Sequence, residues 1–162
     1  MRYLLAAIIA ASFCFGWSDA EALTATGSFS VKVTIAANCV VNSATDMDFG
    51  TQGVLGANVD QTNTMAITCT NTTPYNIGLD KGVNGASVIT RQMKSGAGAL
   101  INYSLYSDSG RTTNWGNTVG TDTVAGTGNG SAQSFTVYGR VPAQTTPAPA
   151  LYTDTITITV TY

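Results

Sequence analysis

The sequence predicts an all-β protein, an antiparallel β-sandwich, from three observations. Apolar and polar residues alternate with a period of two in several short segments, as they do in strands with one buried face. Clusters of Gly, Asn, Ser and Asp separate these segments, as turns require. After about residue 22 no stretch keeps the 3.6-residue period of an amphipathic helix. Many short strands with frequent turn signals are typical of an immunoglobulin-like sandwich.

The first 22 residues are predicted to be a signal peptide. Arg2 precedes an apolar run that extends to about residue 17, and Ala20-Glu21-Ala22 offers small residues at the alternate positions that a signal peptidase accepts. The run is shorter than the roughly 20 apolar residues of a membrane-spanning helix. We therefore expect cleavage after Ala22 and an exported mature protein.

Export determines how the cysteines are interpreted. If Cys14 is removed with the signal peptide, Cys39 and Cys69 remain as a pair in an oxidising compartment, where a disulfide is expected. They lack the close spacing of a metal-binding or redox motif, and the sequence contains no His to complete a metal site. We predict a structural disulfide between Cys39 and Cys69.

Four segments in the middle of the chain are the predicted core strands. Each places every second side chain on one apolar face and is bounded by turn-forming residues. The predicted inward-facing residues are Met65, Ile67 and Cys69 in NTMAITCT; Tyr75, Ile77 and Leu79 in PYNIGLD; Ile101, Tyr103 and Leu105 in LINYSLYS; and Phe135, Val137 and Val141 in QSFTVYGRV. The segments KGVNGAS, KSGAG, SDSGRT and AGTGNGS are predicted turns or loops.

Two further alternating segments stand at the two ends of the mature chain. The N-terminal row is Phe29, Val31, Val33 and Ile35, and the C-terminal row is Ile156, Ile158, Val160 and Tyr162. From Thr155 onward the last segment has none of the charges or prolines that protect an edge strand, so we expect another strand beside it. The spacing of the N-terminal row leaves two interpretations open: the first strand of a complete domain, or a detachable arm.

Catalytic and ligand-binding functions find little support in the sequence. There is no His, and if Glu21 leaves with the signal peptide, Asp side chains are the only acids, which excludes His-based triads and Glu acid/base pairs. Asp46 and Asp48 supply too few oxygens for calcium. The formal charge is -2 and the basic residues are scattered. We predict no enzymatic activity, cofactor, metal or nucleic-acid partner.

Three segments resemble the spore coat protein U domain family, which includes subunits of archaic, Csu-type chaperone–usher pili. They are GSFSVKVTIAANCVV, MDFGT and VYGRVPAQTTPAPALYTDTITITVTY, and the resemblance covers essentially the whole mature chain. Its most specific part is the joined GR-P-AQ loop and terminal strand, from Gly139 to Tyr162. The resemblance implies an immunoglobulin-like domain that lacks one strand and is completed by a donor strand from another chain.

On this resemblance, residues 23–36 would be a donor-strand arm and residues 37–162 a pilin-like β-sandwich. The N-terminal row of one subunit would fill an acceptor groove lined by the C-terminal row of the next, in a head-to-tail polymer. The implied partners are a periplasmic chaperone, an outer-membrane usher and neighbouring pilus subunits. The implied function is that of a structural subunit of a surface pilus that supports adhesion and biofilm formation. The subunit would pass through the periplasm to an extracellular fibre on the cell surface.

Two other classes of protein are alternatives. One is a secreted structural protein of the spore-coat type. The other is a self-contained carbohydrate-binding β-sandwich, which would present exposed aromatic side chains, whereas we expect Trp115, the only mature Trp, to pack in the fold. The length of the chain favours a shaft or minor subunit over a two-domain tip adhesin. The sequence assigns no role to the loop from Pro142 to Pro149.

Overall fold

The computed structural model describes residues 21–162 and divides into two units. The first unit ends at Thr34; its residues 21–34 carry no assigned helix or strand, and every one of their side chains is exposed. The second unit is Ile35–Tyr162. The predicted signal peptide, residues 1–22, lies outside the described residues except for its last two positions.

Antiparallel strands build the whole of the second unit. The nine strands assigned within residues 21–162 are β1 (Cys39–Ala44), β2 (Val59–Cys69), β3 (Pro74–Leu79), β4 (Arg91–Ser95), β5 (Leu100–Tyr106), β6 (Val124–Thr127), β7 (Ala132–Val141), β8 (Tyr152–Thr153) and β9 (Ile158–Thr161). Each strand pairing is antiparallel. The prediction of an all-β, antiparallel protein is confirmed.

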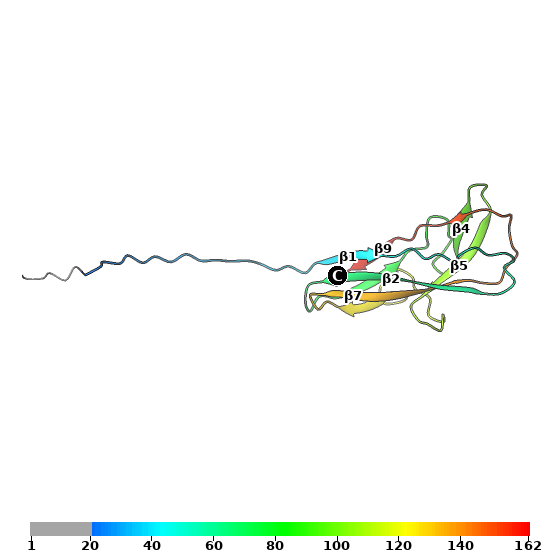
Figure 1. Cartoon of the computed structure of the whole chain (residues 1–162). Helices are drawn as coiled ribbons and strands as arrows, with labels where there is room; N and C mark the ends of the chain where they lie inside the picture. The colour runs from blue at the N-terminus through cyan, green and yellow to red at the C-terminus, as the bar shows by residue number, and fades with distance from the viewer. Residues whose placement is uncertain (1–20) are drawn as a thin grey trace, which may run out of the picture. The chain divides into compact units, whose positions relative to one another are not determined.

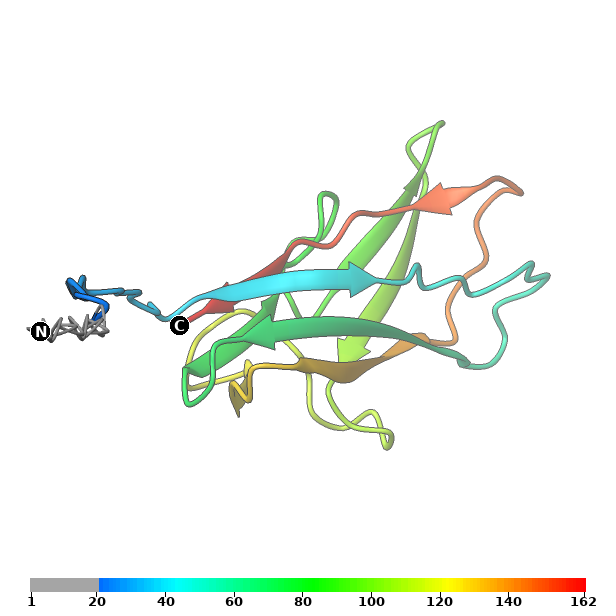
Figure 2. The same cartoon turned by 60° about the vertical axis from the view of Figure 1, so that its left-hand side comes forward.

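The strands form one large curled sheet and one small sheet. The large sheet has the order β1-β2-β7-β5-β4-β8, and the small sheet has the order β6-β3-β9. The curl of the large sheet, which resembles half of a barrel, brings β1 beside β9 at one end of the domain (Figure 1 and Figure 2). Among the described residues β1 pairs only with β2, and β9 only with β3, so each keeps one free hydrogen-bonding edge.

The core is lined by the rows that the period-two pattern predicts. Ten of the twelve predicted inward-facing residues are buried, and Ile101 and Phe135 are partly buried against the same core. Trp115 is 1% exposed, and its indole Nε1 donates to the carbonyl oxygen of Ile77 at 2.8 Å. Trp115 is therefore a core residue, as expected, and is not placed as a sugar-binding platform.

A disulfide joins Cys39 and Cys69, which confirms the predicted bridge. The two residues lie directly opposite each other in the β1–β2 pairing, and Cys69 is fully buried. The bond therefore fixes the beginning of β1, a strand with a free edge, to the core of the domain.

A buried arginine, which the sequence analysis missed, ties three segments together. Arg91 is 0% exposed, and its guanidinium donates to the carbonyl oxygens of Leu79, Asp80, Val88 and Trp115 at 2.6–2.9 Å. Burial lowers the pKa of Arg91, but these acceptors replace the water that the guanidinium loses. Arg91 thereby holds the end of β3 against β4.

Four strands, β1, β4, β6 and β8, were not predicted. The buried positions of β4 are Arg91 and Ser95, so no apolar alternation marks it. β6 lies partly in AGTGNGS, which was predicted to be a turn. Gly126 is paired with Tyr75 across β6 and β3, and an added Cβ would lie 2.5 Å from the Tyr75 ring. This glycine makes room for a core aromatic side chain rather than forming a turn.

The two terminal segments also differ from their predicted form. The predicted strand from Thr155 to Tyr162 is reduced to β9, and Tyr152–Thr153 forms β8 in the other sheet. Exposure still alternates along residues 151–161, so the period-two pattern is present although the segment passes from one sheet to the other. Residues 23–36 carry no assigned strand, since a strand is defined by a hydrogen-bonded partner.

Replacing Cys69 with Ser should lower both the yield and the melting temperature of the exported protein. The bond joins residues 30 positions apart, and closing such a loop stabilises the folded state by about 3–4 kcal/mol in the chain-entropy model. Yield after export and thermal melting without reductant measure the effect. Cys14→Ser is the control, because Cys14 belongs to the predicted signal peptide; equal results for both variants would show that the bridge is dispensable.

Candidate functional site

A cleft opens between the segments that adjoin the free edges of β1 and β9. We call it the edge cleft; its volume is about 610 Å³. One wall is the last residue of β1, Ala44, with residues 45–49, and the other is residues 151–156, which include β8, with the first residue of β9. Its floor consists of side chains from the interior: Met65, Leu79, Met93, Tyr103, Leu105 and Val137. The edge cleft therefore combines an apolar floor with walls that lie beside unpaired strand edges.

The structure brings half of the C-terminal row to the edge cleft. Ile156 and Ile158 line it. Val160 is partly buried against the core beyond the end of the cleft, and Tyr162 is 56% exposed. The Tyr162 hydroxyl donates to Asn38 Oδ1 at 3.3 Å, at the end of the domain where β1 and β9 lie side by side. Binding of a strand by this row remains a prediction.

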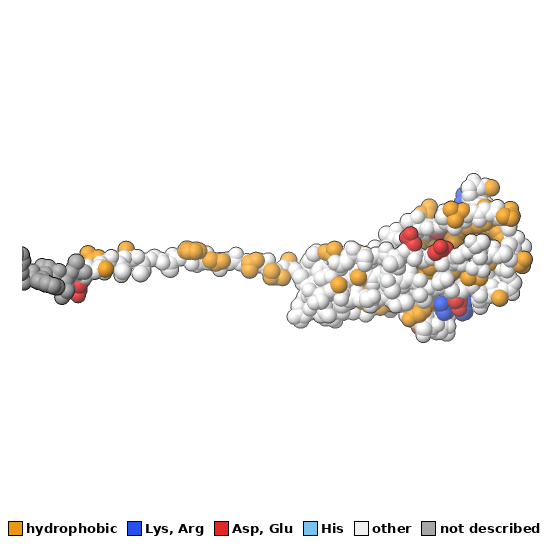
Figure 3. Space-filling model, in the orientation of Figure 1, with side chains coloured by type: hydrophobic (Ala, Val, Ile, Leu, Met, Phe, Trp, Pro, Cys, Tyr) orange, Lys and Arg blue, Asp and Glu red, His pale blue; other side chains and the backbone are white. Residues whose placement is uncertain are grey.

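The N-terminal row has no apolar partner among the described residues. The side chains of Phe29, Val31, Val33 and Ile35 are 89%, 85%, 84% and 76% exposed. Hydrophobic side chains recur along this part of the chain, as the space-filling view shows (Figure 3). A row of four large apolar side chains in water is a surface that requires a partner. Its role as a donor strand remains a prediction.

The first wall of the edge cleft is held in place by a glycine on β7. Met47 and Phe49 pack over Gly139, where an added Cβ would overlap Met47 and lie 3.0 Å from the Phe49 ring. Asp48 Oδ1 accepts a hydrogen bond from the Gly50 amide at 2.8 Å, and Gly50 has φ of 71°, which favours glycine. The MDFGT segment and the glycine of the GR-P-AQ loop are thus in direct contact.

The second wall is anchored by Asp154. Its Oδ1 accepts hydrogen bonds from the backbone amides of Val83 and Asn84 at 2.9 and 3.3 Å, and from Asn84 Nδ2 at 3.0 Å. The hydroxyl of Tyr103 donates to its Oδ2 at 2.7 Å. Burial, followed by the bond to Asp154, raises the pKa of Tyr103, so the phenol remains a donor. Asp154 joins the wall to the core and to the loop after β3.

Asp80 makes a second connection between the same loop and the same wall. Its Oδ1 accepts hydrogen bonds from the amides of Gly82 at 2.9 Å and Thr157 at 3.0 Å. Burial by itself raises the pKa of Asp80, but these amide hydrogen bonds outweigh it and hold the pKa below its ordinary value. The charged carboxylate is therefore the form that stabilises the wall.

The GR-P-AQ loop is explained by the contacts of its polar side chains. Gln144 Oε1 accepts from the Asn102 amide at 3.0 Å, and Gln144 Nε2 donates to the Asn102 carbonyl at 2.9 Å. The backbone N–H of Gln144 also donates to the backbone carbonyl of Leu55 at 2.9 Å. The Gln144 side chain thus bonds both the N–H and the C=O of Asn102 on β5, as a residue of a neighbouring strand would. This fixes the direction in which the chain leaves β7 toward the second wall.

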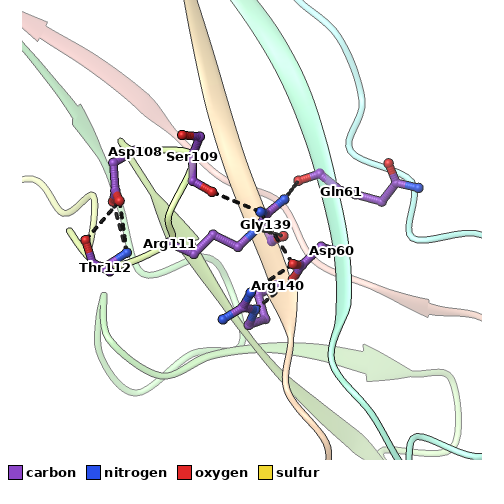
Figure 4. A network of polar contacts seen from close by, with 8 residues as sticks. All are labelled: Asp60, Gln61, Asp108, Ser109, Arg111, Thr112, Gly139 and Arg140. Atoms are coloured by element: carbon purple, nitrogen blue, oxygen red, sulfur yellow. Dashed lines mark hydrogen bonds and ion pairs between the residues drawn. The ribbon is translucent and has the colours of Figure 1, made fainter.

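Arg140, in the same motif, forms an ion pair across the β2–β7 ladder. Its Nε and Nη2 lie 2.7 and 2.8 Å from the carboxylate oxygens of Asp60 (Figure 4). Arg111 Nη1 lies 3.4 Å from the same carboxylate, and Arg111 Nε donates to Gly139 O at 3.1 Å. The hydrogen bond from Arg140 holds the pKa of Asp60 below its ordinary value. The network attaches the loop after β5 to β2 and β7.

The proline loop, whose role the sequence left open, lines a second cavity. This cavity has a volume of about 420 Å³ and shares Met47, Phe49 and Leu151 with the edge cleft. Pro147 and Pro149 contribute to its lining. The loop therefore extends the apolar surface of the edge cleft toward β4 and β5.

The site contains polar residues that the sequence analysis did not select. Asn63 and Asp154 both line the edge cleft. Each occupies an inward position of an alternating row, beside Met65 and Ile156 respectively. A polar residue in an otherwise apolar row is the signal that could have identified them.

Neither a metal-binding cluster nor a membrane-spanning helix is found in the described part of the chain. Residues 21–162 contain no group of three or more His, Cys, Asp or Glu side chains that could hold a metal ion. Asp46 and Asp48 are exposed on the first wall. In the same range, no helix has the length and hydropathy needed to cross a membrane.

An antiparallel domain with an apolar cleft between two free strand edges defines the structural class. The chain belongs to the spore coat protein U domain family, whose model matches residues 25–159. It is similar to Protein U of Myxococcus xanthus, with 31% identity over 177 aligned residues that cover 100% of this chain and 98% of that protein. The resemblance stated from the sequence is confirmed.

A solved structure shows that the fold is pilin-like. The similar chain belongs to the CsuC–CsuE chaperone–tip adhesion subunit pre-assembly complex of the archaic chaperone–usher Csu pili of Acinetobacter baumannii. The two chains superpose with a TM-score of 0.57 and 25% sequence identity over 80% of this chain. The present chain spans 40% of the length of that chain.

Asp80→Asn should make the domain less sensitive to acid. The pKa of Asp80 is lower in the folded state than its ordinary value of 3.8, so its stabilising effect is complete above that value. That effect is lost as the pH falls through the folded-state pKa. Melting temperatures between pH 7 and pH 2 should therefore fall less steeply for Asp80→Asn than for the unsubstituted protein, from a lower value at pH 7. Parallel profiles would contradict the role of Asp80.

Tyr103→Phe should loosen the second wall. The substitution leaves Asp154 Oδ2 without its donor in a partly buried site, which should lower the free energy of unfolding by about 1 kcal/mol. Amide hydrogen exchange at Val83 and Asn84 should become faster. Tyr138→Phe is the control on another strand, and equal exchange in both variants would show that the Tyr103 hydroxyl does not hold the wall.

Proposed function

We propose that the chain is a structural subunit of a surface fibre of the chaperone–usher type, in which residues 23–36 of one subunit fill the edge cleft of the next. One observation carries the proposal: the same chain has an apolar cleft between free strand edges and an exposed segment with alternating apolar residues. Each feature needs a partner of the other's kind. In this proposal an incomplete immunoglobulin-like fold is completed by a donor strand from another chain.

The apolar residues provide the free energy of the proposed contact. Burying one aliphatic or aromatic side chain stabilises a contact by roughly 1.5–3 kcal/mol, and the N-terminal row offers four exposed ones. A ladder of backbone hydrogen bonds to both walls adds to this. Because the donating and accepting surfaces differ, the contact is heterologous, and repetition of a contact that does not close produces a filament.

Charge complementarity supports another copy of the chain as the occupant. The walls of the edge cleft carry Asp46, Asp48 and Asp154. Residues 23–38 contain one cation, Lys32, and no acidic side chain. The segment and the cleft therefore attract each other weakly in any register, while the apolar row sets the depth of insertion.

Insertion requires β1 and β9 to move apart at one end of the domain. A strand that pairs on both sides needs its neighbours about 9–10 Å apart, twice the spacing within a sheet. The edge cleft offers room beside Ile156 and Ile158, whereas Val160 and Tyr162 lie where β1 and β9 are adjacent. We propose that the whole C-terminal row forms the acceptor groove once the strand has separated these edges.

The proposed partners follow from the pathway. The similar solved structure is described as a chaperone–subunit pre-assembly complex, which supports a periplasmic chaperone as the first occupant of the cleft. An outer-membrane usher and neighbouring subunits would follow. In this proposal the protein passes through the periplasm to an extracellular fibre that supports adhesion and biofilm formation.

A secreted spore-coat-type structural protein is the second candidate. The 31% identity with Protein U over nearly the full length of both chains favours it. Genes for a periplasmic chaperone and an outer-membrane usher beside this gene would support the fibre, and a solitary gene would support the coat. The burial of Trp115 gives no support to a carbohydrate-binding sandwich.

Val33→Asp should abolish polymers while leaving the subunit folded. Val33 is 84% exposed in the free chain, so the charge costs nothing there. In a neighbour's edge cleft the same carboxylate would lie among apolar side chains, at a cost of several kcal/mol for each junction. Size-exclusion chromatography of a periplasmic extract and electron microscopy of the cell surface should show a chaperone-bound monomer and no fibres.

Thr34→Asp is the matched control, because Thr34 is the neighbouring residue on the polar row. Its polymers should persist. If Val33→Asp removes the chaperone-bound monomer together with the fibres, Val33 belongs to its own domain's core and the detachable arm is refuted.

A further inference from the structure

We infer that Asn63 is a specificity-determining residue of the edge cleft, and that its side-chain oxygen accepts a hydrogen bond from a backbone N–H of the strand that fills the cleft. The occupant is residues 23–36 of a second copy of this chain, so the inference rests on the proposed function. It adds to that function a polar contact that selects the register of the inserted strand.

Asn63 interrupts an apolar surface. It lies on β2 at an inward position, next to Met65 on the same face and paired with Val137 on β7. Both neighbours belong to the buried core, and all three residues line the edge cleft. An amide in this place is costly unless both its donor and its acceptor are paired.

Only one half of the Asn63 amide is paired in the empty cleft. Its Nδ2 donates to the carbonyl oxygen of Thr45 at 2.7 Å. Its Oδ1 is buried and has no hydrogen-bond partner among the described residues. Because the carbonyl of Thr45 needs a donor, the orientation of the amide is settled and Oδ1 points elsewhere. Buried acceptors are nearly always paired in native proteins, and because Asn63 lines the edge cleft, a strand that fills the cleft can supply the missing donor.

The position of Asn63 identifies the kind of donor that it needs. β1 ends at Ala44, and the next carbonyl along this wall, that of Thr45, is already taken by Asn63 Nδ2. Asn63 Oδ1 therefore remains an unused acceptor beside the end of β1, on a residue that lines the edge cleft. A strand that follows the edge of β1 presents backbone N–H groups to it.

The arm can satisfy Asn63 only through its backbone. The inward side chains of the N-terminal row are hydrocarbons without a donor. Residues 23–38 contain no proline, so each of them carries an N–H. Successive N–H groups of a strand point to opposite sides, so a shift of one residue would turn the donor away and leave Oδ1 unpaired.

The test measures the affinity of a synthetic peptide of residues 23–38 for the full mature chain carrying Val33→Asp, which disables its own arm. Asn63→Leu keeps the size of the side chain and removes both polar atoms. It should weaken peptide binding about tenfold, the effect of one hydrogen bond. Asn63→Ala serves the same purpose if the leucine variant does not fold.

A series of peptides, each methylated at one backbone nitrogen, identifies the donor. Methylation at one position should lower the affinity of the peptide about tenfold for the protein that has Asn63. The same methylation should not lower the affinity further for the Asn63→Leu variant, in which the acceptor is already missing. A purely structural role of Asn63 would lower affinity equally for every peptide. The methylated position that is coupled to Asn63 defines the register of the inserted strand.

Asn114→Leu is the matched control. Asn114 also has a buried Oδ1 without a partner among the described residues, but it does not line the edge cleft. This variant should change the melting temperature and leave peptide affinity within about twofold. Unchanged affinity in Asn63→Leu, or the absence of any coupled methyl position, would overturn the inference. Failure of the unmethylated peptide to bind the cleft with Asn63 would instead overturn the proposed function, and this inference with it.

Discussion

The free hydrogen-bonding edges of β1 and β9 are the constraint on which the rest of the domain depends. A pair of unpaired edges beside an apolar core would ordinarily collapse or aggregate. In this domain each edge segment is fixed to the rest of the fold on the side away from the cleft. The Cys39–Cys69 bond fixes β1 to the core, and Asp80 and Asp154 hold the segment before β9 to the loop after β3. These attachments allow the edge cleft to exist as a defined surface.

Two of the three segments that resemble the family, MDFGT and the segment from Val137 to Tyr162, contribute to the cleft. Met47 and Phe49 of one segment rest on Gly139 of another, and Gln144 directs the chain from β7 toward the second wall. Arg140 adds an ion pair with Asp60 on β2. None of these residues belongs to the N-terminal row. These two segments therefore support the cleft, whereas the third, GSFSVKVTIAANCVV, contains the N-terminal row that the proposed fibre would place in it.

The apolar row of the N-terminal segment and the apolar cleft would both be buried by assembly. The N-terminal row is exposed, and the edge cleft is lined by apolar side chains of the core. Both surfaces favour association, and an unprotected subunit would associate without order. In the proposed fibre each subunit covers the cleft of one neighbour and has its own cleft covered by another, so every apolar row is buried except at the ends.

The sequence by itself determined which face of each long strand is buried. Alternation in β2, β3, β5 and β7 predicted the core side chains, because the faces of a strand follow directly from residue parity. It also determined the disulfide and the packing of Trp115. It did not reveal β4, whose buried residues are Arg91 and Ser95, or β6, where Gly126 accommodates Tyr75.

The tertiary structure decided where the cleft lies. The alternation of the C-terminal row is continuous, yet only Ile156 and Ile158 line the edge cleft, because the chain passes from β8 in one sheet to β9 in the other. Asn63 and Asp154 line the cleft only because segments that are far apart in the sequence come together there. Residue parity records the buried face of a strand, but a free edge is defined by which strands are neighbours. Neighbours are set by long-range pairing and by the curl of the sheet, which no local pattern contains.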